Sequence, residues 1–395
     1  MVYKGKFFDS FEEIEDLREE GKVLHKLLDV MFIVSTAVIC GCNEWKEVHL
    51  WATRKTNIEW LKKYIELPNG IPSLSTIGRL FNYVCPKQFE KCFIQWMRSV
   101  VDLQGRDIVS IDGKTSCGSK DGDKKGLHIV SALCDAGGLI LGQIKTEDKS
   151  NEITAIPELL DMLYLEGCII TIDAMGCQRK IAKKIVKDAK ADYVLNLKAN
   201  QESLLNEVEE YFKDLEESGV IERLNQQMKY THKQESFENE LLQAIKTTEK
   251  GHGRIEKRTY YLSTDIQWMK NAKKDWTGLA GVGMVLREIQ KNEHKSLETA
   301  FFITSVTKVS EFSTAVRSHW GVESMHWCLD VTFKDDANRT RKDKAPNNMA
   351  ILKRLAFNVV KKDTTQYPKE SMKSKRFIAH SDHEYRDYLL NLNFK

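Results

Sequence analysis

The sequence predicts an α/β fold, a mixed sheet flanked by helices, with an all-helical N-terminal domain and an insertion before a late helix. Three observations support this fold class. Residues 1–100 carry apolar side chains at helical spacing. After residue 105, short β-branched runs alternate with amphipathic helices. Two of these runs, 107–112 and 168–173, each end in a lone aspartate.

The composition is that of a folded globular protein, with 395 residues, of which 42% are hydrophobic and 30% charged. The net charge of +3 neither demands nor excludes a nucleic-acid partner. Nine Cys without a CxxC pair indicate reduced thiols and a cytoplasmic protein. Leu27–Cys42 is the most apolar stretch, but it is short and contains Asp29, so we expect a buried helix and no membrane partner.

The N-terminal helical domain is predicted over residues 1–100, with a break at Pro68–Pro72. Its polar faces carry Arg and Lys. This pattern is compatible with three roles: DNA contact through a helix, packing on the core, and dimerisation.

The first part of the core, residues 105–200, has the predicted order β-β-β-α-β-α-β. Its second and third strands, Leu127–Cys134 and Gly138–Thr146, form a hairpin. In a mixed sheet of this order, the fourth strand lies beside the first through a right-handed crossover. Asp112 and Asp173 are then neighbours, although 61 positions (173 − 112) separate them.

The rest of the chain is predicted in three segments. Residues 201–252 form a helical or mobile insertion, because helical spacing gives way to a polar stretch rich in Gln and Lys. Strands return in the second part of the core, residues 253–360, which contains a long helix from Ser310. Residues 361–395 are expected to form a partly flexible basic tail.

Each strand-end aspartate has two interpretations. An ionised carboxylate at the end of a buried strand is costly unless it is hydrogen-bonded or bound to a cation. Asp-Gly often opens a turn, and we expect Gly113 and Lys114 to turn the chain away after Asp112. Capping is the simpler explanation for one such aspartate, but two in one segment make metal binding an equal alternative.

Glu323 supplies a third carboxylate. Trp320, Glu323 and Trp327 lie at i, i+3 and i+7, which predicts a glutamate between two tryptophans on the side of a helix that faces the sheet. A buried glutamate needs a partner. That partner is either Arg317 or His319, or a divalent cation shared with the two aspartates.

Three carboxylates suit Mg²⁺ or Mn²⁺, which prefer oxygen ligands. Two such ions about 4 Å apart can hold the attacking and leaving oxygens of an in-line phosphoryl displacement. A competing zinc or di-iron site at His319, Glu323 and His326 needs a second matching motif, and the sequence has none.

A basic run follows this helix. Residues 334–362 hold nine Lys or Arg, Arg339 and Arg341 among them, against three Asp. Such a run is usually a solvated face, but beside a predicted metal site it favours contact with a phosphate backbone.

Six blocks of residues carry a resemblance to a known family: Ile-Asp-Gly-Lys-Thr (111–115), Asn-Glu-Ile-x-Ala-Ile-Pro (151–157), Thr-Ile-Asp-Ala-Met-Gly-Cys-Gln (171–178), Asp-Tyr-Val-Leu-Asn-Leu-Lys-Ala-Asn-Gln (192–201), Gly-His-Gly-Arg-Ile-Glu (251–256) and His-Trp-Gly-Val-Glu-Ser-Met-His-Trp-x-Leu-Asp-Val-x-Phe (319–333). Together they resemble the DDE transposases of the H-repeat-associated insertion-sequence type, over nearly the whole chain. Any one block alone is a weak signal.

The resemblance implies an RNase H-like core in which Asp112, Asp173 and Glu323 form the catalytic triad and bind two Mg²⁺ or Mn²⁺ ions. It implies that residues 1–100 are the family's transposase-associated helical domain. The implied partners are DNA, as element ends with inverted repeats and as target DNA, and further copies of the chain in a homodimer or higher oligomer. The candidate DNA-binding residues are Lys114, Arg317, His319, Lys198, Arg254, Arg339 and Arg341.

Related transposases that cut DNA through a hairpin carry the signature Tyr-x₂-Arg-x₃-Glu-x₆-Lys. Here His319 replaces the arginine and Asp330 the lysine around Glu323. The predicted function is metal-dependent cleavage at element ends followed by strand transfer into target DNA. The alternatives are an RNase H-like nuclease without strand transfer and an inactive DNA-binding descendant.

Overall fold

The computed structural model describes residues 6–120, 126–146, 152–231, 234–237, 241–251, 253–291 and 294–394. Asn151 and His252, which belong to two of the family blocks, lie outside the described residues. The chain forms two compact units, the first of Met1–Asp102, Gly113–Asn151 and Val322–Lys395, the second of Leu103–Asp112 and Glu152–Gly321. Strand β1 (Ile108–Ser116) and helix α12 (Val309–Val331) contribute residues to both.

The N-terminal part of the first unit is helical, as its periodicity predicts. Its helices are α1 (Lys6–Phe11), α2 (Leu27–Ile39), α3 (Trp45–Ala52), α4 (Lys55–Leu61), α5 (Leu74–Tyr83) and α6 (Pro86–Val100). Helix α2 is apolar on nearly all sides and almost entirely buried. It packs against α13 (Ala345–Lys361), which is also almost entirely buried but carries polar and charged residues. Within the described part of the chain, no helix combines the length and apolarity that a membrane crossing requires.

The predicted hairpin is present in the first unit as the antiparallel strands β2 (Leu127–Cys134) and β3 (Leu139–Thr146). Gly137 closes it with a φ of 97°, a conformation that favours glycine. Asn358 of α13 accepts a hydrogen bond from the backbone N of Ile140 at 2.9 Å and donates one to its carbonyl at 2.8 Å. These two bonds fix α13 against the hairpin.

The C-terminal residues are folded, so the prediction of a partly flexible basic tail is wrong for the described residues up to 394. They form α14 (Met372–Ser381) and α15 (His383–Asn393). Leu389 and Arg386 are fully buried, and the Arg386 guanidinium lies 4.6 Å from the ring centre of Trp60. A count of basic residues does not predict exposure, because a guanidinium stacked on an aromatic ring can be internal.

One sheet runs through both units, in the strand order β3-β2-β1-β4-β5-β11-β10-β9-β8-β7-β6. Strand β4 (Ile169–Ile172) lies parallel to and between β1 and β5 (Asp192–Leu197), as predicted for the fourth strand. The order of the first five strands is that of an RNase H-like sheet, with α7 (Glu152–Met162) and α8 (Arg179–Lys187) between the parallel strands. The expected turn after Asp112 is absent, because β1 continues to Ser116.

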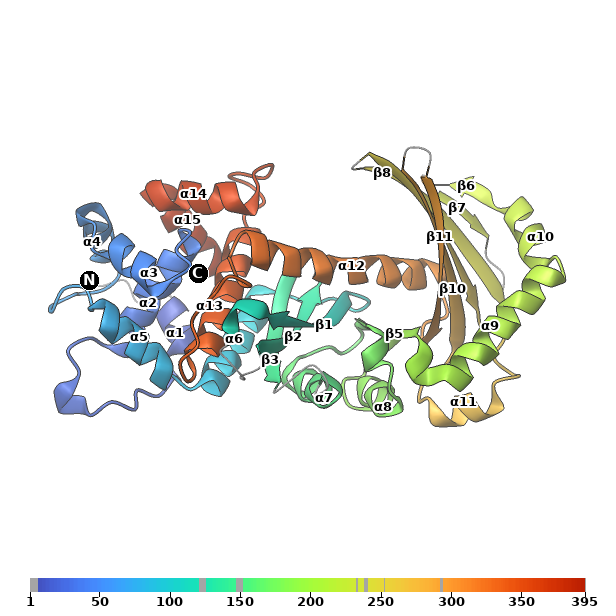
Figure 1. Cartoon of the computed structure of the whole chain (residues 1–395), viewed down its shortest axis with the longest axis horizontal. Helices are drawn as coiled ribbons and strands as arrows, with labels where there is room; N and C mark the ends of the chain where they lie inside the picture. Colours follow the sequence, from blue (N-terminus) through green and yellow to red (C-terminus); the bar gives the residue numbers. More distant parts are fainter. Residues whose placement is uncertain are drawn as a thin grey trace. The chain divides into compact units, whose positions relative to one another are not determined.

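The insertion extends this sheet. It begins with the helices α9 (Glu202–Glu217) and α10 (Val220–Gln227), but strands rather than further helix follow. The strands of the insertion are β6 (Lys229–Thr231), β7 (Gln234–Phe237) and β8 (Leu242–Gly251). The strands predicted for the second part of the core follow as β9 (Arg254–Ser263), β10 (Gly281–Lys291) and β11 (His294–Thr304). Figure 1 shows α9 and α10 along these strands, where Phe212 packs against Phe301 with ring centres 6.1 Å apart.

Candidate active site

Asp112 and Asp173 lie at matching positions of two neighbouring parallel strands. In the register of β1 and β4, Ile111 stands opposite Ile172, an offset of 61 positions (172 − 111). The same offset separates the two aspartates (173 − 112), so both follow the last paired residues. Their carboxylates therefore meet at the carboxyl end of β4, as the sequence predicted.

Asp173 is half-buried and only partly satisfied. Its Oδ1 accepts hydrogen bonds from the backbone N of Met175 at 3.1 Å and of Gly176 at 3.3 Å, so the capping interpretation is correct for this oxygen. Its Oδ2 has no hydrogen bond within the described ranges. Burial and then the negative charge of Asp112 raise the pKa of Asp173 above its ordinary value. The two carboxylates are held together at an electrostatic cost that a bound cation would offset.

The turn after Asp173 is fixed by packing and by two amide side chains. A Cβ on Gly176 would lie 2.1 Å from Cγ2 of Ile172, so only glycine fits. Asn200 donates a hydrogen bond to the carbonyl of Ala174, the residue after Asp173, at 2.7 Å. Gln201 donates one to the carbonyl of Cys177 at 3.0 Å. These contacts give Asn200 and Gln201 a positioning role.

A row of hydroxyl groups lies beside the aspartates. Ser110 and Thr171 stand opposite each other, two residues before Asp112 and Asp173, and therefore face the same side of the sheet. Thr171 Oγ1 donates to Ser110 Oγ at 3.1 Å and lies 2.9 Å from Nδ1 of His319. Because the threonine has one hydroxyl hydrogen, Nδ1 of His319 is the donor in this chain of bonds. His319, predicted as a DNA contact, thus lies beside the aspartates, and its charge acts on Asp173.

Helix α12 is packed on this face of the sheet. Phe312 and Ala315 belong to the same buried core as Ile108 and Ile169, which stand opposite each other one row below Ser110 and Thr171. A Cβ on Gly283 would lie 2.2 Å from Cζ of Phe312, so this glycine lets the ring reach the sheet. Helix α12 therefore runs along the sheet from the apolar pair Ile108 and Ile169 to the hydroxyl pair Ser110 and Thr171.

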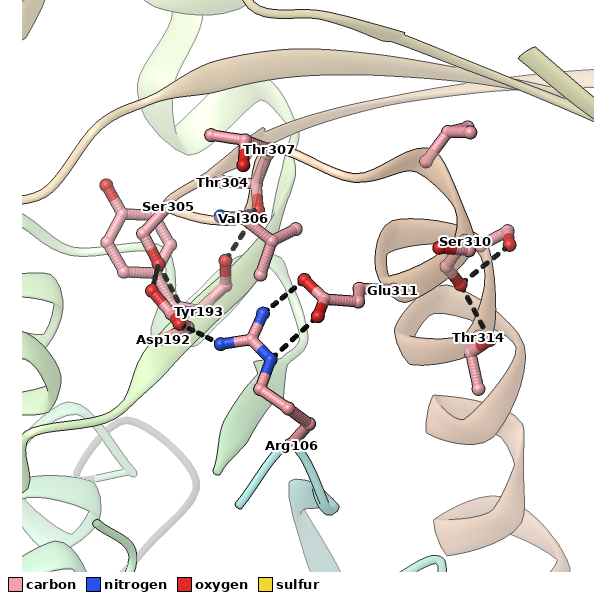
Figure 2. A network of polar contacts seen from close by, with 12 residues as sticks. Arg106, Asp192, Tyr193, Thr304, Ser305, Val306, Thr307, Ser310, Glu311 and Thr314 are labelled. Carbon is pink, nitrogen blue, oxygen red and sulfur yellow. Dashed lines mark hydrogen bonds and ion pairs between the residues drawn. The ribbon is translucent and has the colours of Figure 1, made fainter. Parts of the chain in front are cut away.

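Arg106 ties the start of α12 to the start of β5 (Figure 2). Its guanidinium donates to Asp192 and, through two nitrogens, to Glu311 in the first turn of the helix. The other carboxylate oxygen of Asp192 accepts a hydrogen bond from Ser305 at 2.7 Å. Arg106 has a φ of 78°, which is unfavourable for a side chain with a Cβ. Its ion pairs stabilise this backbone conformation and hold the first turn of α12 beside the start of β5.

The prediction that Glu323 is buried between two tryptophans on α12 is wrong. Glu323 is exposed, and Trp327 is 65% exposed. The buried apolar residues of this part of the helix are Val322, Met325 and Leu329, and Val322 stands one position before Glu323. Because each residue turns a helix by about 100°, a shift of one position moves a side chain from the buried face to its edge.

Neither of the ion pairs considered for Glu323 forms. Arg317 makes a two-pronged ion pair with Glu249, at 2.9 and 3.1 Å, and His319 bonds to Thr171. Glu323 has no hydrogen bond or ion pair with any described residue. The described ranges hold no cluster of three or more His, Cys, Asp or Glu arranged to bind a metal, which applies to Asp112, Asp173 and Glu323 as well as to His319, Glu323 and His326.

The other predicted DNA-binding residues differ in how far their charges are neutralised. Lys114 is 13% exposed and donates to Asp330, the residue that departs from the hairpin signature, at 2.6 Å. Arg254 pairs with the buried Glu256 at 3.3 Å. Lys198 is exposed directly after β5. Lys114 and Arg254 therefore have carboxylate partners already, whereas Lys198 faces solvent.

The basic run after α12 divides into a surface part and an internal part. Arg339 and Arg341 are exposed. Lys353 and Arg354 are 0% and 1% exposed, and lie 3.5 and 3.6 Å from the carboxylate oxygens of the buried Asp335. The prediction that this whole run faces a phosphate backbone is therefore wrong for its internal part.

Three residues near the aspartates were not predicted. Ser110 and Thr171 had a detectable signal, since each stands two residues before an aspartate in the sequence Ser-Ile-Asp or Thr-Ile-Asp. Glu152 is 3% exposed at the start of α7, and its charge also raises the pKa of Asp173. Nothing in its periodicity marked it as part of the site.

The side chains present fit a hard divalent cation. Asp112 and Asp173 offer carboxylate oxygens at the end of rigid strands, and at least one of these oxygens is not used by the fold. An RNase H-like sheet with aspartates at matching positions of its first and fourth strands is typical of enzymes that transfer phosphoryl groups of nucleic acids.

Comparison with known proteins identifies the family. The profile of the family described as "Transposase DDE domain" matches residues 103–359, and that of the family described as "DDE_Tnp_1-associated" matches residues 8–97. The chain therefore belongs to the transposase DDE domain family, and the predicted resemblance is confirmed.

Several relatives match most of the chain, and two of them are named as transposases here. The "Putative transposase YncI" of Escherichia coli O157:H7 is 41% identical over 360 residues, covering 89% of this chain and 86% of the relative. The "H repeat-associated putative transposase YhhI" of E. coli K12 is 35% identical over 366 residues, covering 91% of each. A structure of the piggyBac transposase synaptic complex with hairpin DNA matches at 9% identity and a TM-score of 0.40, over 99% of this chain and 76% of that one, a level from which we draw nothing.

Proposed function

We propose that this chain is a DNA transposase that cleaves DNA at the ends of its element and joins those ends to target DNA in the cytoplasm. The observation that carries the proposal is the pair Asp112 and Asp173, which meet at the end of β4 within the matched transposase domain. The raised pKa of Asp173 supports a cation at this place.

We assign Glu323 as the third carboxylate of the site, with Asp112 and Asp173 as the other two, for two Mg²⁺ or Mn²⁺ ions. The assignment is supported by the match of the transposase DDE domain family to residues 103–359, a range that contains all three carboxylates. When bound, such ions activate the attacking oxygen and stabilise the leaving 3′ oxygen.

The neighbouring side chains orient the reacting groups. His319, which is held through Nδ1 by Thr171 beside the aspartates, is proposed to orient a phosphate oxygen or a water of the substrate. Asn200 and Gln201 keep the turn after Asp173 in place. Lys198, exposed beside this turn, is the cation best placed in this unit for the DNA backbone.

The DNA partner has two forms, the element ends with their inverted repeats and the target duplex. Because two ends must be joined in one reaction, we propose that a homodimer or a higher oligomer assembles on DNA. This proposal takes its support from family membership and from the relatives named as transposases.

The test is a cleavage and joining assay with duplexes that carry the borders of the gene. Wild type should nick these duplexes with Mg²⁺ or Mn²⁺ and join a 3′-hydroxyl end to a plasmid. Asp112→Asn, Asp173→Asn and Glu323→Gln should lose both steps, while Asp214→Asn, the same charge change at an exposed site of α9, should keep them. Cleavage without joining would favour a nuclease. Full activity of Glu323→Gln would refute its assignment.

A further inference from the structure

A groove in the first unit is lined by two segments that lie far apart in the sequence. Its volume is about 620 Å³. One wall comes from the N-terminal helices α3 and α5, with Trp45 and Lys46, and the other from residues 338–345, with Arg339, Arg341 and Lys342. The first wall belongs to the region matched by the associated domain, and the second to the region matched by the DDE domain. The groove therefore joins the two matched regions.

The charges of this groove are mostly unneutralised. Its lining includes four basic side chains, and Glu44 is the one acidic residue among the described residues that line it. Lys46, Arg339 and Lys342 are exposed and make no ion pair or hydrogen bond with any described side chain. By contrast, Lys353, from the same basic run, is buried against Asp335. Like charges gathered without carboxylates are costly, and a polyanion removes that cost.

The backbone just before the second wall is held by hydrogen bonds from the end of β1 and the residues that follow it. The Asp335 carbonyl accepts a hydrogen bond from the Ser116 hydroxyl at 2.9 Å, and the Asp336 carbonyl accepts one from the backbone N of Gly118 at 2.8 Å. Asn338, which is 7% exposed, accepts a hydrogen bond from the backbone N of Thr340 at 3.0 Å. The basic side chains thus start from a fixed backbone, which lowers the entropy cost of binding.

The first wall adds an aromatic surface. The Trp45 ring is half-buried and stacks on Phe81, with ring centres 5.0 Å apart and an angle of 25° between the planes. One face of the indole is therefore covered by Phe81, and the rest of the ring lines the groove. An aromatic ring between cations suits a nucleic acid, in which apolar sugars and bases alternate with phosphates.

We propose that this groove binds the sugar-phosphate backbone of DNA, with Lys46, Arg339, Arg341 and Lys342 on phosphates and Trp45 against a sugar or base. The inference rests on the proposed function, because it takes the substrate to be DNA. It assigns DNA contact to both matched regions at one place, and it adds Trp45, Lys46 and Lys342 to the predicted contacts.

The experiment measures binding of labelled duplex DNA to the full chain by fluorescence anisotropy between 50 and 200 mM salt. Each lost phosphate contact lowers the slope of log K against log salt by about 0.9. The variant Lys46→Ala/Arg339→Ala/Lys342→Ala should therefore lower the slope by about 2 to 3 and weaken binding at least tenfold at low salt. Trp45→Phe should reduce the quenching of tryptophan fluorescence by DNA.

The control removes the same charge from exposed lysines of the first unit outside the groove, Lys62→Ala/Lys369→Ala/Lys373→Ala. It should keep the wild-type slope, and both triple variants should unfold at the wild-type temperature. Equal slope losses in the two variants would mean that net charge, and not the groove, determines the salt dependence of DNA binding, and would overturn the proposal. An unchanged slope in the groove variant would also overturn the proposal. So would displacement of the labelled duplex by polyglutamate at a lower concentration than by unlabelled DNA of equal charge.

Failure of this inference is separable from failure of the proposed function. If wild type cleaves and joins DNA but the groove variant keeps its salt slope, the groove is refuted and the transposase activity stands. If wild type never cleaves DNA while the groove variant loses the slope, the activity is refuted and the groove stands as a DNA-binding site.

Discussion

Replacing Asp173 by asparagine tests the paired-carboxylate site most directly. The substitution removes one of two adjacent charges but keeps an oxygen that can accept the hydrogen bonds from Met175 and Gly176. Because burial and Asp112 raise the pKa of Asp173, the folded state binds more protons than the unfolded state above about pH 4. The stability that this carboxyl contributes is therefore lost as pH rises through its folded pKa. Without metal, Asp173→Asn should be more stable than wild type at pH 7, and the gain should shrink on acidification.

Metal should reverse this order. A cation that binds only the folded protein stabilises it by about 2.7 kcal/mol at a concentration 100 times its Kd. For a unit of about 150 to 250 residues, the range to which the second unit belongs, that free energy corresponds to a rise in unfolding temperature of roughly 5 to 10 °C. Asp173→Asn and Asp112→Asn should lose most of this rise, because each removes a charged ligand oxygen.

The assay is scanning calorimetry in EDTA and in rising Mg²⁺ or Mn²⁺ at several pH values. Asp214→Asn, on the exposed side of α9, serves as the matched control and should show the full wild-type response. Two results would refute the reasoning: a wild-type protein whose unfolding temperature ignores divalent cations, or an Asp173→Asn variant that is less stable in EDTA yet keeps the whole metal response.

Three further substitutions test the packing around the site by urea unfolding. Gly176→Ala places a Cβ 2.1 Å from Ile172 and should cost roughly 1 to 3 kcal/mol; a neutral effect would mean that the turn adapts. Thr171→Val removes hydrogen bonds of 2.9 and 3.1 Å and should cost roughly 1 to 3 kcal/mol, and a stability equal to wild type would show that these bonds contribute nothing. Asp335→Asn leaves Lys353 buried without a charge partner and should cost roughly 3 to 5 kcal/mol, and an unchanged stability would show that Lys353 does not depend on this carboxylate.

Much of the core followed from local sequence patterns. Alternating β-branched runs predicted the strands, and the right-handed crossover rule predicted that the fourth strand lies beside the first. Those two facts were enough to bring Asp112 and Asp173 together. The strands of the insertion were missed, because polar strands such as β8 are stabilised by pairing with β9 rather than by an apolar pattern of their own.

The sequence by itself determined the family, the order of the central strands and the meeting of the two aspartates, because these depend on residue order and on short-range periodicity. Only the tertiary structure decided which charges are neutralised. Lys353 is internal because Asp335 lies against it, whereas Lys342 faces a groove. Likewise, one position along α12 separates the buried Val322 from the exposed Glu323. Burial depends on partners brought in from distant parts of the chain, and no local pattern encodes it.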